Sequence, residues 1–435
     1  MIDLLRANDP ATGFPPSWYA DTCALPAPRQ PLDGDRQVDV AIIGAGFTGL
    51  NAARTLAEAG LTPLVIDARQ AGWGASGRNG GQVCSGYNKS QRWLEQRLGA
   101  DTARGLWDLC EAGKSRLRSQ VAALAPDANY KSGIAHGSLT ARDFEDEKRD
   151  ADHLATAYGY TDMEVLEVAD FQSVLRSPLY YGGTIDHGAG HIHPLRLVLA
   201  LAQEAEAAGA TIVENTEVTA IETGPHARLT TPTGTVTAKH VIIAGNGYLR
   251  RLSWRYAARV MPVNSFIGAT APLGNRTGDV LGADIASADS SHVVNYLRLS
   301  EDGRLLFGGR ANFSHRFPND IGGKLHARIA EMFPQIADVP LDYTWGGTLG
   351  VTMTRLPWIS RLAPQVYIAG GYSGHGVALS GMAGHAMAQA ILGQSANFDL
   401  FAKIPSGTLP LGPYAQGPML SLAMAWYAMR DRLGV

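Results

Sequence analysis

Cysteine is scarce in this chain of 435 residues, and its few copies form no recognisable pattern. The three cysteines are Cys23, Cys84 and Cys110, and they fit neither a CxxC pair nor the spacing of a zinc site. We therefore expect no disulfide framework, no metal centre and a reducing compartment. A chain of this length can bury a large hydrophobic core and needs neither disulfides nor a structural metal ion for stability.

Long apolar runs and an excess of one charge are also missing. No stretch reaches the ~18 apolar residues that a membrane-spanning helix needs, and the opening MIDLLRANDP holds no apolar signal core. The net charge of −3 favours neither nucleic acid nor an anionic membrane as a partner. We expect a soluble, cytoplasmic protein with no integral membrane segment. The stretch 418–429, PMLSLAMAWYAM, is interpreted as a C-terminal helix docked on the body, with membrane contact as the alternative.

Glycine, by contrast, is abundant, with 50 copies, and the first cluster of glycines follows a buried strand. Residues 38–43 form a continuous apolar run, which is typical of a strand in a parallel sheet. The turn 44–49 reads GAGFTG, a helix is expected through Ala59, and a second strand at 63–66 ends at Asp67. This is the order strand, glycine turn, helix, strand of a βαβ unit.

The spacing G-x-G-x-x-G gives each glycine of this turn a physical task. Gly44 allows the tight turn, Gly46 lets a pyrophosphate approach the backbone, and Gly49 lets the helix pack on the strand. The helix N-terminus offers unpaired N–H groups to phosphates, and Asp67 can accept bonds from ribose hydroxyls. We predict a dinucleotide site here; the alternative is an ordinary βα turn.

A second glycine cluster indicates which dinucleotide is bound. The segment 74–82, GASGRNGGQ, holds four glycines in nine residues and is typical of a loop wrapped closely around a ligand. Ser76 and Asn79 add polar contacts, and Arg78 adds a cation for phosphate. A nicotinamide cofactor has no need of such a loop at this position, whereas a flavin reaches deeper across the sheet and does.

The remaining pattern divides the chain into two interleaved units. Residues 91–180 show mainly helical spacing, and 258–350 alternate in the manner of antiparallel strands, as at 295–298 and 305–309. A helix from Pro194 to Gly209 precedes expected strands at 211–214, 217–222 and 241–244. A last strand at 366–369 leads through glycines into a helix ending at Leu392. We predict an α/β plus α+β protein with an N-terminal arm (1–36), a Rossmann-type FAD-binding domain (37–90, 190–255 and 350–395), an antiparallel-sheet substrate domain (91–189 and 256–349) and a C-terminal extension with a helix (396–435).

Five segments together resemble one family. GAGFTG, GWGASGRNGGQ, GHIHP, TAKHVIIAGNGYL and GGYSGHGVALSGMAGHAMA are similar to segments of the flavin-dependent D-amino-acid oxidase superfamily, and most closely to its gamma-glutamylputrescine oxidases. The resemblance implies a glutathione-reductase-like FAD domain and non-covalent FAD, because the segment 351–354, where some relatives attach the flavin, has no thiol. It implies oxidation of gamma-glutamylputrescine, or a similar primary amine, by molecular oxygen to aldehyde, ammonia and hydrogen peroxide, in putrescine catabolism.

The resemblance also assigns FAD contacts residue by residue. Gly44, Gly46, Phe47 and Thr48 are assigned to the pyrophosphate, Asp67 and Ala68 to the ribose, Gly74, Ala75, Ser76, Arg78, Asn79, Gly80, Gly81 and Gln82 to the loop around pyrophosphate, ribityl chain and flavin edge, Val218 to the adenine, Ala244, Gly245 and Asn246 to a strand end beside the nucleotide, and Gly371, Tyr372, Ser373, Gly374, His375, Gly376 and Val377 to the pyrimidine end of the flavin. Asp67 departs from the family, in which glutamate is usual at this position.

The substrate wall is predicted less directly. His191 and His193 alternate onto one face, as do Tyr296 and Arg298 on an expected strand, and either pair could line the active-site cleft or be structural. Trp345 could stack on substrate or belong to the core, and Tyr372 is placed at the cleft. His375 is the candidate catalytic residue, as a donor to the flavin; a spacer or part of the wall is the alternative.

Two further motifs and two alternative functions compete with this interpretation. Gly113-Lys114-Ser115 lacks the upstream glycine of a P-loop, and Gly371-Tyr372-Ser373-Gly374-His375 ends in histidine where a serine hydrolase has glycine. The main rival is a D-amino-acid or secondary-amine dehydrogenase that passes electrons to a respiratory carrier. The other is a non-catalytic FAD-binding subunit of a larger complex.

Overall fold

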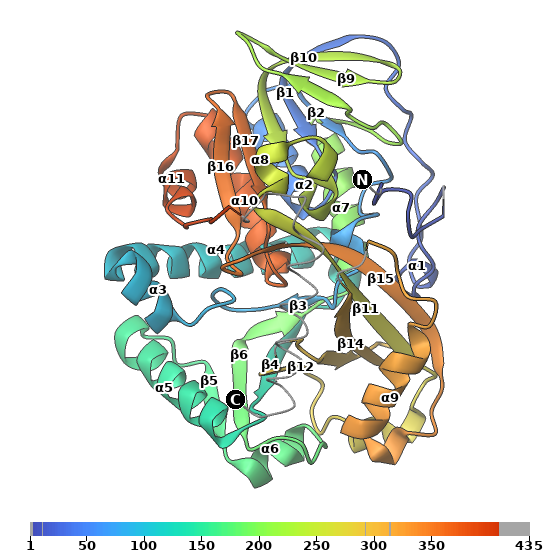
Figure 1. The fold of residues 1–435 in the computed structure, drawn as a ribbon, viewed down its shortest axis with the longest axis vertical. Coiled ribbons are helices and arrows are strands. Elements are labelled where there is room, and N and C mark those ends of the chain that lie inside the picture. The colour runs from blue at the N-terminus through green and yellow to red at the C-terminus, as the bar shows by residue number, and fades with distance from the viewer. Residues whose placement is uncertain (1–2, 11, 292, 313–314, 409–435) are drawn as a thin grey trace.

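The computed structural model describes residues 3–408 except 11, 292, 313 and 314 (Figure 1). The stretch 418–429, interpreted above as a docked helix, lies outside the described residues. Of the C-terminal extension the structure describes α11 (Ala396–Ala402) and a few residues after it.

The upper half of the molecule in Figure 1 is built on a sheet, here called sheet A, with the strand order β16-β17-β10-β1-β2-β7. Strands β17, β10, β1, β2 and β7 run parallel, and β1 has partners on both sides, as its uninterrupted apolar sequence requires. An antiparallel flap, β8 and β9, extends from β10. The strands are β1 (Arg36–Ile43), β2 (Pro63–Ile66), β7 (Thr211–Val213), β8 (Ala220–Glu222), β9 (Ala227–Thr231), β10 (Gly234–Ile243), β16 (Trp358–Ala363) and β17 (Val366–Gly370).

Helices bury the apolar faces of sheet A. The helices α2 (Phe47–Glu58), α7 (Pro194–Ala207) and α10 (Gly376–Ile391) share one core with the long α4 (Ala100–Leu124). A Cβ on Gly384 of α10 would lie 2.0 Å from the carbonyl oxygen of Thr48, so glycine lets α10 pack directly on α2. The helices α3 (Gln91–Leu98) and α8 (Trp254–Ala257) complete this half.

A second sheet, sheet B, forms the lower half in Figure 1, with the order β15-β11-β14-β13-β12-β4-β6-β3 and β5 paired to β6. It is antiparallel except for the pair β12 and β4. Its strands are β3 (Gln82–Val83), β4 (Lys131–Gly137), β5 (Met163–Leu166), β6 (Gly183–His191), β11 (Val260–Thr270), β12 (Ala286–Asp289), β13 (Tyr296–Leu299), β14 (Leu305–Asn312) and β15 (Leu341–Thr352). The helices around it are α5 (Ala141–Tyr158), α6 (Val168–Val174) and α9 (Gly322–Met332).

The structure corrects three details of the expected elements. Strands β4 and β5 interrupt the region 91–180, which was expected to be mostly helical. The strand expected at 217–222 is confined to β8, and the strand expected at 241–244 is the end of the longer β10. Strands β5 and β8 are short and mostly exposed or half-exposed, so their sequences carry little alternation of apolar and polar residues.

The N-terminal arm is anchored at several points. Its short helix α1 (Trp18–Asp21) places Trp18 and Tyr19 in the core, with exposures of 2% and 0%. Farther upstream, Arg6 pairs with Glu217 at 2.7 Å. The arm therefore belongs to the folded body, which its proline-rich sequence did not predict.

Candidate active site

Two adjoining cavities lie between and beside the sheets. The smaller one, of about 370 Å³, follows the carboxyl ends of the parallel strands of sheet A. The larger one, of about 800 Å³, lies against sheet B. Six residues line both cavities and mark their junction: Ala75, Asn79, Leu349, Ser373, Gly374 and Val377.

The turn at 44–49 forms one wall of the smaller cavity, and its geometry leaves no room for a side chain at the glycine positions. A Cβ on Gly49 would lie 1.9 Å from the Gly44 carbonyl oxygen, and one on Gly46 would lie 2.7 Å from the Ser76 hydroxyl. Gly44 has φ +108°, a conformation that glycine adopts readily. The backbone at the start of α2 is therefore open to a ligand that approaches closely, as the sequence predicted.

Asp67 lies at the end of β2 on the wall of the same cavity. Its carboxylate accepts the backbone N–H of Ala45 at 2.7 Å and that of Arg69 at 2.8 Å. The pKa of this carboxyl is raised to about 6, because burial and the nearby Glu214 raise it by more than the two N–H donors lower it. The group is placed to accept hydroxyl donors and also shapes the glycine turn.

The loop 74–82 is fixed internally by Asn79. The side-chain amide of Asn79 donates to the carbonyls of Ala75 and Ser76, at 3.0 and 2.9 Å, and its oxygen accepts the N–H of Gly81 at 2.8 Å. Ser76 accepts the N–H of Phe47 at 3.0 Å and so ties the loop to the first turn of α2. These hydrogen bonds fix the conformation of the loop, which lines both cavities.

Arg78 differs from its expected use as a cation for phosphate. Its guanidinium pairs with Asp9 of the arm at 2.8 Å, with both side chains nearly buried, and donates to the Tyr248 hydroxyl at 3.0 Å. It also lies over the ring of Trp73, 4.4 Å from the centroid. The charge of Arg78 is neutralised by Asp9, and Arg78 lines the larger cavity but not the smaller one.

Arg298 and Trp345, expected on the substrate wall, lie behind the loop instead. Arg298 donates from Nε to the carbonyl of Gly80 at 3.1 Å and from Nη2 to the hydroxyl of Tyr19 at 3.2 Å. Trp345 donates from Nε1 to the carbonyl of Arg78 at 3.2 Å, and its ring meets that of Tyr19 edge to face. The linings of both cavities omit Arg298 and Trp345, so these buried side chains support the loop from behind.

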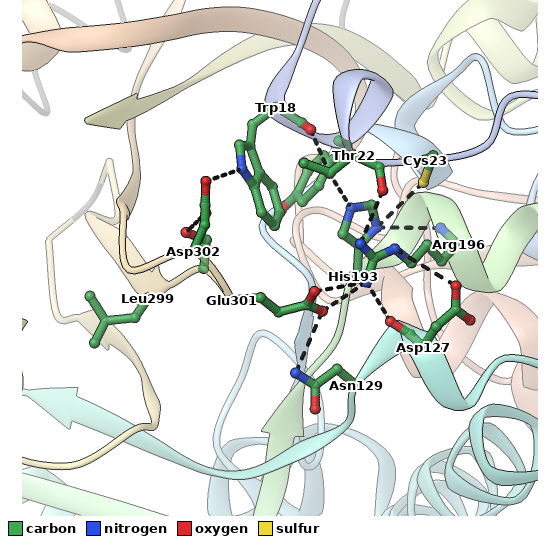
Figure 2. A network of polar contacts seen from close by, with 12 residues as sticks. Trp18, Thr22, Cys23, Asp127, Asn129, His193, Arg196, Leu299, Glu301 and Asp302 are labelled. Carbon is green, nitrogen blue, oxygen red and sulfur yellow. Dashed lines mark hydrogen bonds and ion pairs between the residues drawn. The ribbon is translucent and has the colours of Figure 1, made fainter. Parts of the chain in front are cut away.

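His191 and His193 are likewise buried away from both cavity linings. The ring of His193 contacts the Thr22 hydroxyl, 3.1 Å from Nε2, and lies among residues of the arm and of α7 (Figure 2). Both ring nitrogens of His191 lack a hydrogen-bond partner within the described part of the chain. Burial lowers the pKa of each imidazole to about 2, with arginine charges adding to the effect, so both rings are neutral and structural.

Tyr296, Tyr372 and His375 do reach the cavities. Tyr296 lines the larger cavity, where its hydroxyl lies 3.3 Å from that of Ser265. Tyr372 lines the smaller cavity, and its hydroxyl lies 2.9 Å from Oγ1 of Thr48. His375 precedes α10 on the wall of the larger cavity, where burial and, to a smaller extent, the charge of His136 together lower the pKa of its imidazole to about 4.

The expected FAD contacts are distributed over both cavities. The smaller cavity is lined by Gly44, Gly46, Phe47, Thr48, Asp67, Ala68, Gly74, Ala75, Ser76, Asn79, Val218, Ala244, Gly245, Asn246, Tyr372, Ser373, Gly374, Gly376 and Val377. Arg78, Gly80, Gln82 and His375 line the larger cavity only. Gly81 and Gly371 are absent from both linings, and their N–H groups donate to side-chain oxygens of Asn79 and Asn246.

Several polar residues of the larger cavity were not singled out from the sequence. His136 of β4 pairs through Nδ1 with Glu147 of α5, and Asp186 of β6 accepts from the hydroxyl of Tyr160. Asp186 also accepts the N–H groups of Gly188 and Ala189, at 3.0 and 3.1 Å. These groups lie far apart in the chain, and no local motif links them; a buried ionisable residue on a strand is the only signal that the sequence offers.

The arrangement fits an elongated dinucleotide that ends in a broad ring system. The smaller cavity offers a close backbone approach at Gly46, an acid at Asp67 and the start of α10, and it opens into the larger cavity at the loop 74–82. Within the described residues, no group of three His, Cys, Asp or Glu side chains could hold a metal ion. Over the same residues, no helix is long and apolar enough to cross a membrane.

Comparison with known proteins agrees with this geometry. Residues 39–390 match the family model described as FAD dependent oxidoreductase. The chain is 39% identical to the probable oxidoreductase OrdL of Rhizobium meliloti (strain 1021), over 96% of this chain and 97% of that one. It is 34% identical to the gamma-glutamylputrescine oxidoreductase of Escherichia coli (strain K12), over 96% and 99% of the two chains. Among solved structures, glycine oxidase from Geobacillus kaustophilus superposes with a TM-score of 0.68 at 22% identity, over 82% of this chain and 95% of the other.

The fold is therefore a Rossmann-type FAD domain joined to an antiparallel-sheet substrate domain, and the chain belongs to the FAD-dependent oxidoreductases of the D-amino-acid oxidase family. It is an enzyme of the class whose members act on amines and amino acids.

Proposed function

We propose that this enzyme is a cytoplasmic amine oxidase of putrescine catabolism that oxidises gamma-glutamylputrescine, or a similar primary amine, with molecular oxygen. The products are an aldehyde, ammonia and hydrogen peroxide, formed from the amine, oxygen and water. The FAD-contact residues assigned above would hold the cofactor without a covalent bond. When bound, FAD supplies the acceptor for the hydride that leaves the carbon next to nitrogen.

The charge on the wall of the larger cavity is the observation that carries the proposal. Four carboxylates line it: Glu147 and Asp150 from α5, where they pair with His136 and Arg92, and Asp186 and Asp289 from sheet B. Cationic side chains line the same cavity, namely Arg78, Lys89, His136 and Arg355, so we assign the attraction of an ammonium group to Asp186, whose carboxylate accepts from the Tyr160 hydroxyl and two backbone N–H groups. The near full-length similarity to a gamma-glutamylputrescine oxidoreductase supports a diamine derivative as that substrate.

Residues of the protein would orient the amine and exclude water from its surroundings. The start of α10 would direct unpaired backbone N–H groups toward the junction of the cavities, where negative charge is favoured. Leu349 lies at the junction and Tyr296 lines the larger cavity, and both residues are half-buried. His375 remains neutral at pH 7, so its contribution would be a hydrogen bond and not a charge.

The proposal is tested with a panel of amines under two electron acceptors. Purified holoenzyme is given gamma-glutamylputrescine, putrescine, D-alanine, D-proline or sarcosine, and peroxide is measured in air. The same panel is repeated without oxygen, with a quinone dye as acceptor. We expect peroxide with gamma-glutamylputrescine and a much lower kcat/KM for putrescine, because the glutamyl group supplies binding energy for orientation. Turnover of D-amino or secondary amino acids with the dye alone would instead establish the dehydrogenase.

A further inference from the structure

An ion pair on the wall of the larger cavity lies outside the set of residues assigned to FAD. His136 lies on β4 and Glu147 on α5, and Nδ1 of the imidazole contacts Oε1 of the carboxylate. Thr184, the residue opposite His136 in the β4–β6 register, donates its hydroxyl to Oε2 of Glu147 at 3.3 Å. All three residues line the cavity.

Both charges of the pair remain accessible from the cavity. The His136 side chain is 40% exposed and that of Glu147 is 16% exposed. Within the described residues, Nε2 of His136 makes no hydrogen bond, so its N–H can donate to a ligand. Among the residues that the structure describes, Oε2 of Glu147 accepts only the long hydrogen bond from Thr184, so it retains the capacity to accept another.

The imidazole of His136 is charged at neutral pH. Burial lowers its pKa, but the carboxylate of Glu147, with help from Asp289 and Asp143, outweighs burial and raises the pKa to about 9. The cavity wall therefore presents one positive and one negative charge side by side.

The head group of an α-amino acid has the complementary pattern. Its ammonium and carboxylate groups are attached to the same carbon, so they lie about one ion-pair distance apart. An ammonium can pair with Glu147 while a carboxylate accepts from His136, and each charge of the wall keeps a partner of opposite sign. A simple amine or a neutral acyl group can satisfy at most one of the two.

We propose that His136 and Glu147 form a subsite for the zwitterionic α-amino acid head of the substrate, remote from the amine that reacts. This inference rests on the proposed function and deepens it, because it names the chemical feature by which a glutamyl amine is distinguished from a free diamine. The reacting amine then extends toward the junction of the two cavities.

Four acylated putrescines separate the two charges of the head. Gamma-glutamylputrescine carries both charges, glutarylputrescine only the carboxylate, 4-aminobutyrylputrescine only the ammonium, and N-butyrylputrescine neither. In the wild type, we expect kcat/KM to fall roughly ten- to hundredfold for each charge removed, as is usual when a charged hydrogen bond is lost. Glu147→Gln should become insensitive to loss of the ammonium, and His136→Gln to loss of the carboxylate.

A matched control exists in the same sheet. Nε2 of His187 lies 2.8 Å from Oε2 of Glu164, but both side chains are about half exposed and neither lines the cavity. Glu164→Gln and His187→Gln should leave the whole pattern of kcat/KM unchanged. The FAD content and melting temperature of each variant confirm that it folds.

Failure of the subsite and failure of the proposed function give different results. If the wild type oxidises gamma-glutamylputrescine but both variants lose as much as the wild type when head charges are removed, the subsite is overturned and the oxidase remains. If no acylated putrescine is oxidised, calorimetric titration with L-glutamine, which carries the head and the amide, still tests the subsite. We expect binding to the wild type that both cavity variants lose; equal binding by all proteins would overturn the proposal.

Discussion

The guanidinium of Arg298 donates to the carbonyl of Gly80 at 3.1 Å and to the hydroxyl of Tyr19 at 3.2 Å. A residue of sheet B and a residue of the N-terminal arm thereby fix the backbone of the loop that is predicted to enclose the flavin. Trp345 makes a similar contact two residues earlier in the loop, where its Nε1 donates to the carbonyl of Arg78 at 3.2 Å.

Removing this support should weaken FAD binding. Arg298→Met leaves the Gly80 carbonyl without its donor, and an unsatisfied buried group of this kind costs about 1–3 kcal/mol. We expect the dissociation constant of FAD, measured by fluorescence titration of the apoprotein, to rise about tenfold or more, and Tyr19→Phe to show a smaller rise in the same direction. Arg304→Met, which removes ion pairs to Asp302 and Asp342 at the surface, serves as the control. Unchanged affinity in Arg298→Met would show that the loop holds its shape alone.

Asp67 should control FAD affinity through its charge. Loss of a charged hydrogen bond costs ~1.5–3 kcal/mol, so Asp67→Ala should bind FAD roughly ten- to a hundredfold more weakly. Because the pKa of the carboxyl is about 6 in the apoprotein, protonation below that pH removes an acceptor, and wild-type affinity should decline from pH 7 to pH 5. Asp39, whose pKa is about 2 and whose carboxylate binds Lys239 on the surface, provides the control Asp39→Asn. An affinity that stays constant from pH 7 to pH 5 would contradict an acceptor role for Asp67.

FAD should leave the denatured protein. The segment 351–354 has no cysteine, and Cys84, the cysteine on the wall of the larger cavity, is an unreactive thiol because burial raises its pKa to about 12. Acid precipitation should therefore leave the yellow colour in the supernatant. Colour in the pellet would identify a covalent link, and Cys84→Ala would then show whether this thiol forms it.

Because of the ion pair between His136 and Glu147, the free energy of unfolding should fall as the pH becomes alkaline. The folded-state pKa of His136, about 9, exceeds its ordinary value of 6.5, so its contribution is complete below pH 6.5 and is lost as pH rises through 9. Because the imidazole is 40% exposed, solvent screening limits the contribution to about 1 kcal/mol. Urea unfolding at pH 6.5 and pH 9.5 should show a larger loss for the wild type than for Glu147→Gln. Equal losses in the two proteins would mean that the pair does not stabilise the fold.

His375 should contribute to activity without a charge. Burial and the nearby positive charge of His136 hold the pKa of its imidazole at about 4, so the ring is neutral throughout pH 6–9. His375→Asn, which keeps a neutral donor, should retain kcat/KM within about fivefold and show the wild-type pH profile. A pH profile that loses an inflection near neutrality in this variant would show that His375 titrates during the reaction.

The part of the fold that could be predicted from the sequence is the part built from local patterns. The strand, turn and helix around Gly44 lie within about two residues of the prediction, because a buried strand and a glycine turn need only neighbouring residues to define them. Strands β4 and β5 were missed because their pairing partners are distant and their alternation is weak.

Side-chain alternation shows which residues share a face but not which side faces the ligand. Tyr296 and Arg298 do lie on the same strand, yet Tyr296 reaches the cavity while Arg298 turns behind the loop. The pair of His136 and Glu147 was missed for a related reason, since it exists only through the packing of α5 on sheet B. Asp9, which neutralises Arg78, comes from an arm that carries no periodic signal.

Because the two domains are built from alternating segments of the chain, the FAD site can form only after the later segments have been synthesised. Strand β17 completes the parallel core of sheet A with residues 366–370, and the loop 74–82 receives its supports from Arg298 and Trp345. A ribosome must therefore have synthesised most of the polypeptide before the flavin pocket can close, even though its glycine turn is among the first segments to emerge. FAD should therefore bind only near the end of synthesis, and a nascent chain stalled before residue 345 should not retain FAD.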